Sequence, residues 1–68
     1  MIYYNAIVKT DYQTSIKYHD ITKLDKFFEY ISSNVSVKVI FVYKKLRRKD
    51  SKGQFYGIWT KKKGLKIF

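Results

Sequence analysis

The chain has 68 residues, a formal net charge of +10 and no cysteine, which excludes disulfides, a thiolate nucleophile and a sulfur-ligated zinc site. The longest apolar run, residues 39–43, is too short to cross a bilayer, and no basic leader precedes an apolar stretch. We therefore expect a cytoplasmic protein with no membrane partner. A chain of this length buries only about 60% of its unfolded surface, so residues 1–68 are predicted to form one small domain of marginal stability.

The charge is distributed unevenly along the chain. Residues 1–34 contain four lysines and four acids, whereas residues 35–68 contain eleven basic residues and one acid. Like charges at this density repel one another and destabilise a compact state, which favours a bound polyanion. The asymmetry predicts nucleic acid, either DNA or RNA, as the partner. An acidic protein is the alternative partner. A third interpretation needs no partner, in which the lysine-rich face is simply solvated.

Alternating side chains predict two strands at the start of the chain. Residues 2–9 alternate between two faces and are rich in aromatic and β-branched residues, and residues 12–19 alternate with one polar face. Thr10 and Asp11 lie between them and are typical of a turn, although a tight hairpin usually contains glycine. The two segments are therefore expected to form a hairpin.

Residues 22–33 change to a helical period. Apolar side chains recur with the spacing of one helix face at Leu24, Phe27, Phe28 and Ile31. Thr22 and Asp25 resemble a capping box, with Asp in the position that Glu usually takes. We interpret the apolar stripe as part of the core, because so short a chain cannot leave it exposed.

The second half of the chain predicts further strands. Residues 35–43 are apolar on both faces, which is typical of a central strand. Residues 50–53 are expected to form a type I turn that closes at glycine, and residues 54–60 return as a strand. Residues 65–68 would extend that strand or form a fifth one.

The order of elements predicts an α+β fold of the form ββαββ. The simplest packing is an antiparallel sheet of four strands, or five, with the helix on one face. A helix of about 12 residues covers only part of such a sheet, so the other face stays open or pairs with something. A small closed β-barrel with an inserted helix is the competing architecture. The register of the second hairpin stays open, with either Trp59 near Tyr43 or Ile58 near Leu46.

The basic second hairpin is the predicted binding site. If residues 44–49 are extended, they span about 17 Å and alternate between faces, so that a protruding ribbon could contact phosphates on both sides. Neighbouring aromatic side chains could stack on unpaired bases, although core packing is favoured for each of them taken singly. The predicted nucleic-acid contacts are Lys44, Lys45, Arg47, Arg48, Lys49, Lys52, Tyr56, Trp59, Lys61, Lys62 and Lys63.

Catalysis and metal binding have weak support in the sequence. His19 is the only histidine, and Asp20 beside it would point to the opposite face of a strand and so would not orient it. The scattered acids give no metal-ligand spacing, and the sequence predicts no cofactor. A ribonuclease-type toxin built on His19 is therefore the least favoured hypothesis.

The sequence favours a non-enzymatic nucleic-acid-binding protein of the kind that serves as an accessory factor in phages and mobile elements. The alternative is a small inhibitor or adaptor that docks onto an acidic protein by charge and through an edge strand such as residues 2–9 or 54–60. A homodimer is compatible with every one of these hypotheses, because an open sheet face and marginal stability both favour association.

Overall fold

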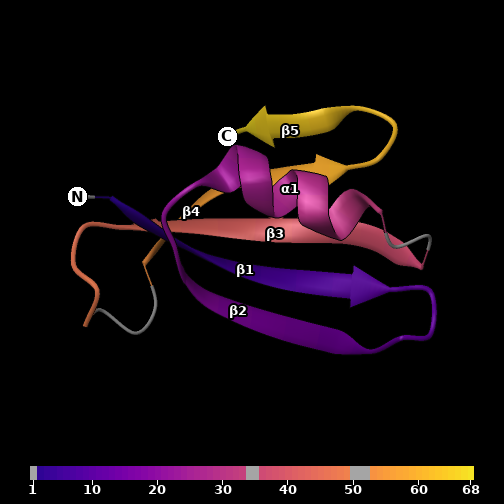
Figure 1. Ribbon diagram of the computed structural model, residues 1–68, viewed down its shortest axis with the longest axis horizontal. Helices are drawn as coiled ribbons and strands as arrows, with labels where there is room; N and C mark the ends of the chain where they lie inside the picture. The colour runs from indigo at the N-terminus through magenta and orange to yellow at the C-terminus, as the bar shows by residue number, and fades with distance from the viewer. Residues whose placement is uncertain (1, 34–35, 50–52) are drawn as a thin grey trace.

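An antiparallel sheet with a helix on one face makes up the structure (Figure 1), a computed structural model that describes residues 2–33, 36–49 and 53–68. The elements in chain order are β1 (Tyr3–Thr10), β2 (Ser15–Ile21), α1 (Leu24–Ser32), β3 (Val37–Lys45), β4 (Gln54–Thr60) and β5 (Gly64–Ile67). The order across the sheet is β2-β1-β3-β4-β5, and every neighbouring pair is antiparallel. The predicted α+β fold is confirmed with five strands, and the closed-barrel alternative is wrong because the sheet is open.

The helix is the connection between two parallel strands. β2 and β3 are both antiparallel to β1, so they run in the same direction and need a crossover connection, which α1 supplies (Figure 1). The strand predicted from residues 35–43 is central, as expected. The edges are β2 and β5, so the two segments considered for edge pairing, residues 2–9 and 54–60, are interior strands instead.

The core lies between the sheet and α1. β1 and β3 contribute fully buried aliphatic side chains at Val8, Ile40 and Val42. From the helix, Ile31 is buried, and the Phe28 ring stacks on Trp59 with centroids 5.5 Å apart and 13° between the ring planes. The apolar stripe of the helix is therefore core, as predicted.

The turn between β1 and β2 is longer than expected. The backbone N–H of Thr10 donates to the carbonyl of Thr14 at 3.1 Å, and Gln13 adopts a φ of 61°. β2 consequently begins at Ser15, and Tyr12 is an exposed turn residue, so the prediction of a strand from residue 12 is wrong at that end.

The predicted capping box is also wrong. Lys23 is the N-cap residue of α1, and no side chain caps the helix there. The carbonyl of Lys23 accepts a hydrogen bond from Phe27 N–H at 3.1 Å. Because the helix begins at Leu24, Thr22 lies one residue before the position from which a hydroxyl caps the first turn.

A β-bulge sets the register of β3 against β4. Ile40 pairs with Trp59 and Tyr43 pairs with Phe55, and the register shifts between these pairs. Neither predicted register occurs, because pairing Trp59 with Ile40 places both large side chains in the core under α1. The bulge also places Tyr56 against the core, on the side opposite to Phe55.

Gly57 lets β4 and β5 approach closely. A Cβ atom at this position would lie 2.5 Å from the carbonyl oxygen of Lys66, which is closer than real Cβ contacts. Beyond β5, the backbone N–H of Phe68 donates to the carbonyl of Tyr56 at 3.0 Å. Residues 65–68 therefore add a fifth strand to the sheet and do not extend the fourth.

No described element covers the sheet on the side away from α1. The strand pairings place a set of apolar side chains there, which we call the open face: Ile7, Phe41, Tyr43, Phe55 and Ile58. The accessible surface of the chain is 5195 Å², above the value of about 4,500 Å² expected for a folded protein of this mass. The excess is consistent with a sheet that is covered on one side.

Candidate nucleic-acid interface

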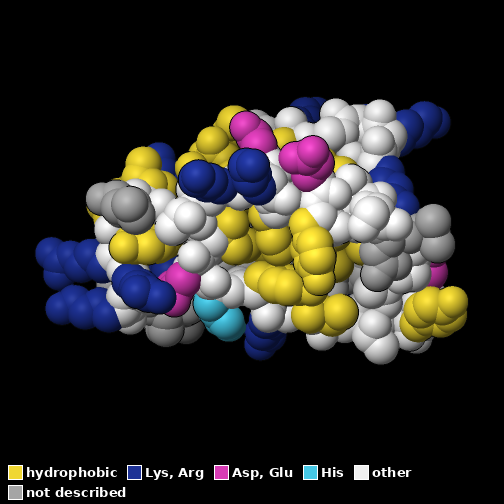
Figure 2. All heavy atoms as spheres, in the orientation of Figure 1, with side chains coloured by type: hydrophobic (Ala, Val, Ile, Leu, Met, Phe, Trp, Pro, Cys, Tyr) yellow, Lys and Arg dark blue, Asp and Glu magenta, His cyan; other side chains and the backbone are white. Residues whose placement is uncertain are grey.

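The exposed cations among the predicted contacts form two separate groups. The loop cluster comprises Arg47, Arg48 and Lys49, directly after β3, and the turn cluster comprises Lys61, Lys62 and Lys63, between β4 and β5. The seven residues of β4 separate the two clusters by about 20 Å. Figure 2 shows Lys and Arg side chains gathered at the corresponding two ends of the molecule. The predicted cations therefore do not converge on one point.

Lys45 does not belong with these exposed cations. Its side chain is 3% exposed, and its Nζ lies 2.7 Å from Oδ1 of Asp20. Nζ also donates a hydrogen bond to the carbonyl oxygen of Arg48 at 3.0 Å. A strand continuing through 44–49 was expected to present this lysine to a ligand, but β3 ends at Lys45 and the side chain holds the following loop against β2.

A bend in β2 brings the acid to Lys45. Asp20 has a φ of 59°, and its backbone N–H donates to Oδ1 of Asn5 at 3.3 Å. Arg48 Nε lies 3.5 Å from the second carboxylate oxygen. The hydrogen bond from Lys45, reinforced by the charges of Lys45 and Arg48, lowers the pKa of Asp20 below its ordinary value. Asp20 is therefore engaged by cations, and His19 beside it gains no catalytic partner from it.

The two predicted aromatic contacts lie on the covered side of the sheet. Trp59 is 8% exposed and stacks on Phe28, so a base cannot reach its ring. Tyr56 is half-buried, with its ring 5.4 Å from that of Tyr4 and with Nζ of Lys44 5.8 Å from its centroid. Lys52, also predicted as a contact, lies outside the described residues.

A different set of aromatic side chains lines the open face. Tyr43, Phe55 and Phe68 form a row across β3, β4 and the end of β5, which we call the aromatic row. The ring centroids of Tyr43 and Phe55 are 5.6 Å apart, and those of Phe55 and Phe68 are 5.9 Å apart. Phe55 is 45% exposed and Phe68 is 68% exposed, so their rings reach the surface.

The β-bulge explains why the sequence did not reveal this row. Phe55 and Trp59 are four residues apart, so regular alternation assigns them to the same face of a strand. The shift in register between Phe55 and Gly57 places them on opposite faces. A glycine inside a strand pattern indicates a bulge or a close backbone approach, and in this sequence Gly57 is that glycine.

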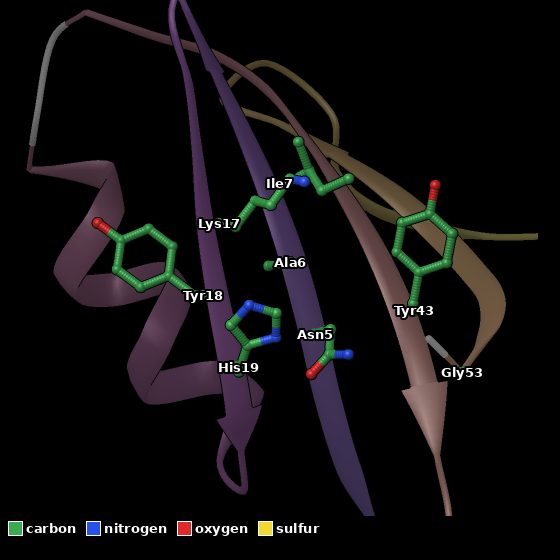
Figure 3. A pocket seen from close by; sticks show the side chains of 8 residues that line it. All are labelled: Asn5, Ala6, Ile7, Lys17, Tyr18, His19, Tyr43 and Gly53. Carbon is green, nitrogen blue, oxygen red and sulfur yellow. The ribbon is translucent and has the colours of Figure 1, made fainter. Parts of the chain in front are cut away.

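A shallow cavity of about 360 Å³ adjoins the row on the open face. Asn5, Lys17, His19 and Tyr43 contribute to its lining, and Figure 3 shows these side chains around it. Tyr18 comes from the same strand but packs on the helix side, with its ring 5.1 Å from that of Phe27. The cavity is thus lined by a cation, a histidine and an aromatic ring, and no described cluster of His, Cys, Asp or Glu could hold a metal there.

The charges differ between the two sides of the sheet. Lys23 and Lys26 are balanced by Asp25 and Glu29 on or next to α1, so the net charge resides on the strands and loops. On the open face Lys17 pairs with Ile7 and Lys66 pairs with Ile58, at the two edges of the sheet. The described acids outside the helix are Asp11, in the β1–β2 turn, and Asp20, which is paired with Lys45. The open face is therefore apolar in the middle and cationic at its borders.

Comparison with family models, curated proteins and solved structures finds no match to this chain. In the described part of the chain, α1 is too short to cross a membrane and no other helix is long and apolar enough to do so.

Proposed function

We propose that this is a non-enzymatic nucleic-acid-binding accessory protein that contacts phosphates through the loop cluster and the turn cluster. The observation that carries the proposal is the placement of its charge. The net charge of +10 lies off the helix, on strands and loops, and two clusters of exposed cations lie at the ends of a sheet whose uncovered face carries aromatic rings. Nucleic acid supplies both the negative charge and the planar apolar surfaces that match such a molecule.

Salt dependence tests the phosphate contacts directly. If roughly four to six of the clustered cations contact phosphate, log K is expected to fall with log salt with a slope of about −3 to −4 on a single strand. On duplex DNA the slope is expected to be about −4 to −5. Fluorescence anisotropy with labelled single-stranded DNA, RNA and duplex DNA, at several salt concentrations, measures these slopes. Absence of binding to all three probes at low salt would disprove the proposal.

A matched pair of charge reversals separates specific contacts from overall charge. The double substitution Arg47→Glu/Lys49→Glu changes the net charge by the same amount as Lys23→Glu/Lys26→Glu at the start of α1. The loop substitutions should weaken binding to every probe and flatten the salt slope, whereas the helix substitutions should change both much less. Equal effects of the two pairs would mean that net charge, and not the loop cluster, governs the interaction.

A further inference from the structure

We infer that the open face binds unpaired bases, so that the ligand is single-stranded nucleic acid whose bases stack on the aromatic row. This inference rests on the proposed function and specifies its ligand. It starts from three exposed or half-buried rings, which come from β3, from β4 and from the residue after β5, at centroid separations of 5.6 and 5.9 Å. Their backbones are held by the sheet ladder and by the hydrogen bond from Phe68 N–H to Tyr56. The rings are therefore presented by a rigid support.

The row lies next to the loop cluster. The last pair of residues before the connection that carries the loop cluster is Lys44 of β3 and Gln54 of β4. The neighbouring pair, one step further into the sheet, is Tyr43 and Phe55. β5 runs toward the same end of the sheet (Figure 1), so Phe68 is also there. One strand of nucleic acid stacked on the row would thus have its phosphates within reach of Arg47 and Lys49. The turn cluster lies at the other end of β4.

Further cations border the row on the open face itself. Nζ of Lys66 lies 5.8 Å from the centroid of Phe68, at one edge of the sheet. Lys17 lies on β2, at the other edge, beside the shallow cavity. Rings in the middle with cations on both sides are the arrangement by which proteins bind single strands, since stacking holds the bases while cations follow the backbone. A duplex keeps the faces of its bases inside the helix, so it would leave the aromatic row without a partner.

A second copy of the chain fits this face less well. Two sheets packed through their open faces would bury the aromatic row, but they would also bring together two chains that each carry a charge of +10. Lys17 and Lys66 of one copy would face the cations of the other across a surface where the nearest described acid, Asp20, is already paired. Like charges placed together in this way are repulsive. Charge complementarity therefore favours a polyanion over a homodimer.

The test compares binding of a labelled oligothymidylate of about 12 nucleotides with binding of a duplex of equal length. Phe55→Ala and Phe68→Ala are each expected to weaken binding of the single strand by about 5- to 100-fold, the effect of losing one stacked base. Neither substitution should change duplex binding by more than about 2-fold, because phosphate contacts need no ring. Tyr30→Ala, which removes an exposed ring from α1, is the matched control and should leave both affinities unchanged.

One further variant and two solution measurements make the outcome decisive. Phe55→Tyr keeps the ring and should retain binding, which separates lost stacking from a disturbed fold, and thermal unfolding of each variant verifies that it is folded. Equal affinity for single strand and duplex, unaffected by Phe55→Ala and Phe68→Ala, would overturn the inference and leave the proposed function standing. No binding to any nucleic acid would overturn both. A homodimer in sedimentation that Phe68→Ala converts to a monomer would overturn the inference by assigning the open face to a second copy.

Discussion

The ammonium group of Lys45 lies 2.7 Å from Oδ1 of Asp20, and this contact joins the end of β3 to the end of β2 across the intervening strand β1. The lysine is nearly buried, yet it belongs to the densest run of cations in the sequence. Its contact with Asp20 offsets one of these charges, and Asp20 also approaches Arg48 at 3.5 Å. One acid from the neutral first half of the chain thus reduces the repulsion within the basic second half.

Substitution of Lys45 should therefore act on stability. Lys45→Met keeps the apolar stem but removes the ammonium group from Asp20 and from the carbonyl of Arg48. We expect the melting temperature to fall by several degrees, because a half-buried carboxylate loses its closest partner. Lys49→Met removes an exposed cation and is the control, for which we expect little change. Equal melting temperatures for the two variants would contradict a structural role for Lys45.

Stability should fall in acid because of the same pair. The pKa of Asp20 is lowered in the folded chain, first by its hydrogen bond from Lys45, while the unfolded chain keeps the ordinary value of 3.8. Below that value the unfolded state takes up the proton first, so the contribution of Asp20 is present at higher pH and disappears as the pH falls through the lowered pKa. Melting curves of the wild type and Asp20→Asn should therefore differ at pH values above the ordinary pKa and converge in strong acid. A constant difference at all pH values would argue against this linkage.

The position of Trp59 predicts a spectroscopic result. Trp59 is 8% exposed and its ring stacks on Phe28 under α1, so its emission should be blue-shifted and poorly quenched by iodide. Saturation with an oligonucleotide should leave that emission nearly unchanged, because bases would bind on the other side of the sheet. Trp59→Ala removes a core ring and should destabilise the fold by about 3–5 kcal/mol, enough to unfold a marginal domain. Strong quenching on binding, as expected for a stacking tryptophan, would contradict the assignment of bases to the open face.

Local patterns were sufficient to predict most of the fold. Two-residue alternation located the strands, and the spacing of Leu24, Phe27, Phe28 and Ile31 located the helix, because both periods follow from burial on one side of an element. The central place of β3 followed from apolar residues on both of its faces. These properties depend on neighbouring residues in the chain, and so the sequence displays them.

The candidate site depends on contacts that are distant in the sequence. Whether Lys45 meets a ligand or an acid depends on a bend at Asp20, twenty-five residues earlier, where a non-glycine residue adopts a φ of 59°. Which of Phe55 and Trp59 is exposed depends on one bulge in the pairing of β3 with β4. Composition and periodicity reveal neither the bend nor the bulge. The sequence-based prediction therefore placed Lys45 and Trp59 in the wrong environments.

Gly57 should be harder to replace than Gly64, the other glycine next to β5. A methyl group at Gly57 would lie 2.5 Å from a backbone oxygen of β5, which cannot move without loss of strand pairing, so Gly57→Ala should destabilise the chain by about 1–3 kcal/mol. Gly64 has a φ of 72° but open space around its Cβ position, so Gly64→Asn should be tolerated. Amide exchange of β5 distinguishes the two cases, with rapid exchange expected in Gly57→Ala alone. Protection of β5 in that variant would mean that the two strands can separate slightly and still pair.

The two cationic clusters should contribute unequally to single-strand binding. The loop cluster adjoins the aromatic row, whereas the turn cluster lies about 20 Å away at the other end of β4. Arg47→Ala/Lys49→Ala should therefore make the salt slope for a short oligothymidylate less negative by about 1.4, the value for two lost phosphate contacts on a single strand. Lys61→Ala/Lys63→Ala removes the same charge and should change that slope by less than half as much. The difference should shrink when the oligonucleotide is long enough to reach both ends of the sheet. If the substitutions at Lys61 and Lys63 instead weaken binding of the short oligothymidylate more than those at Arg47 and Lys49, the ligand does not lie over the aromatic row.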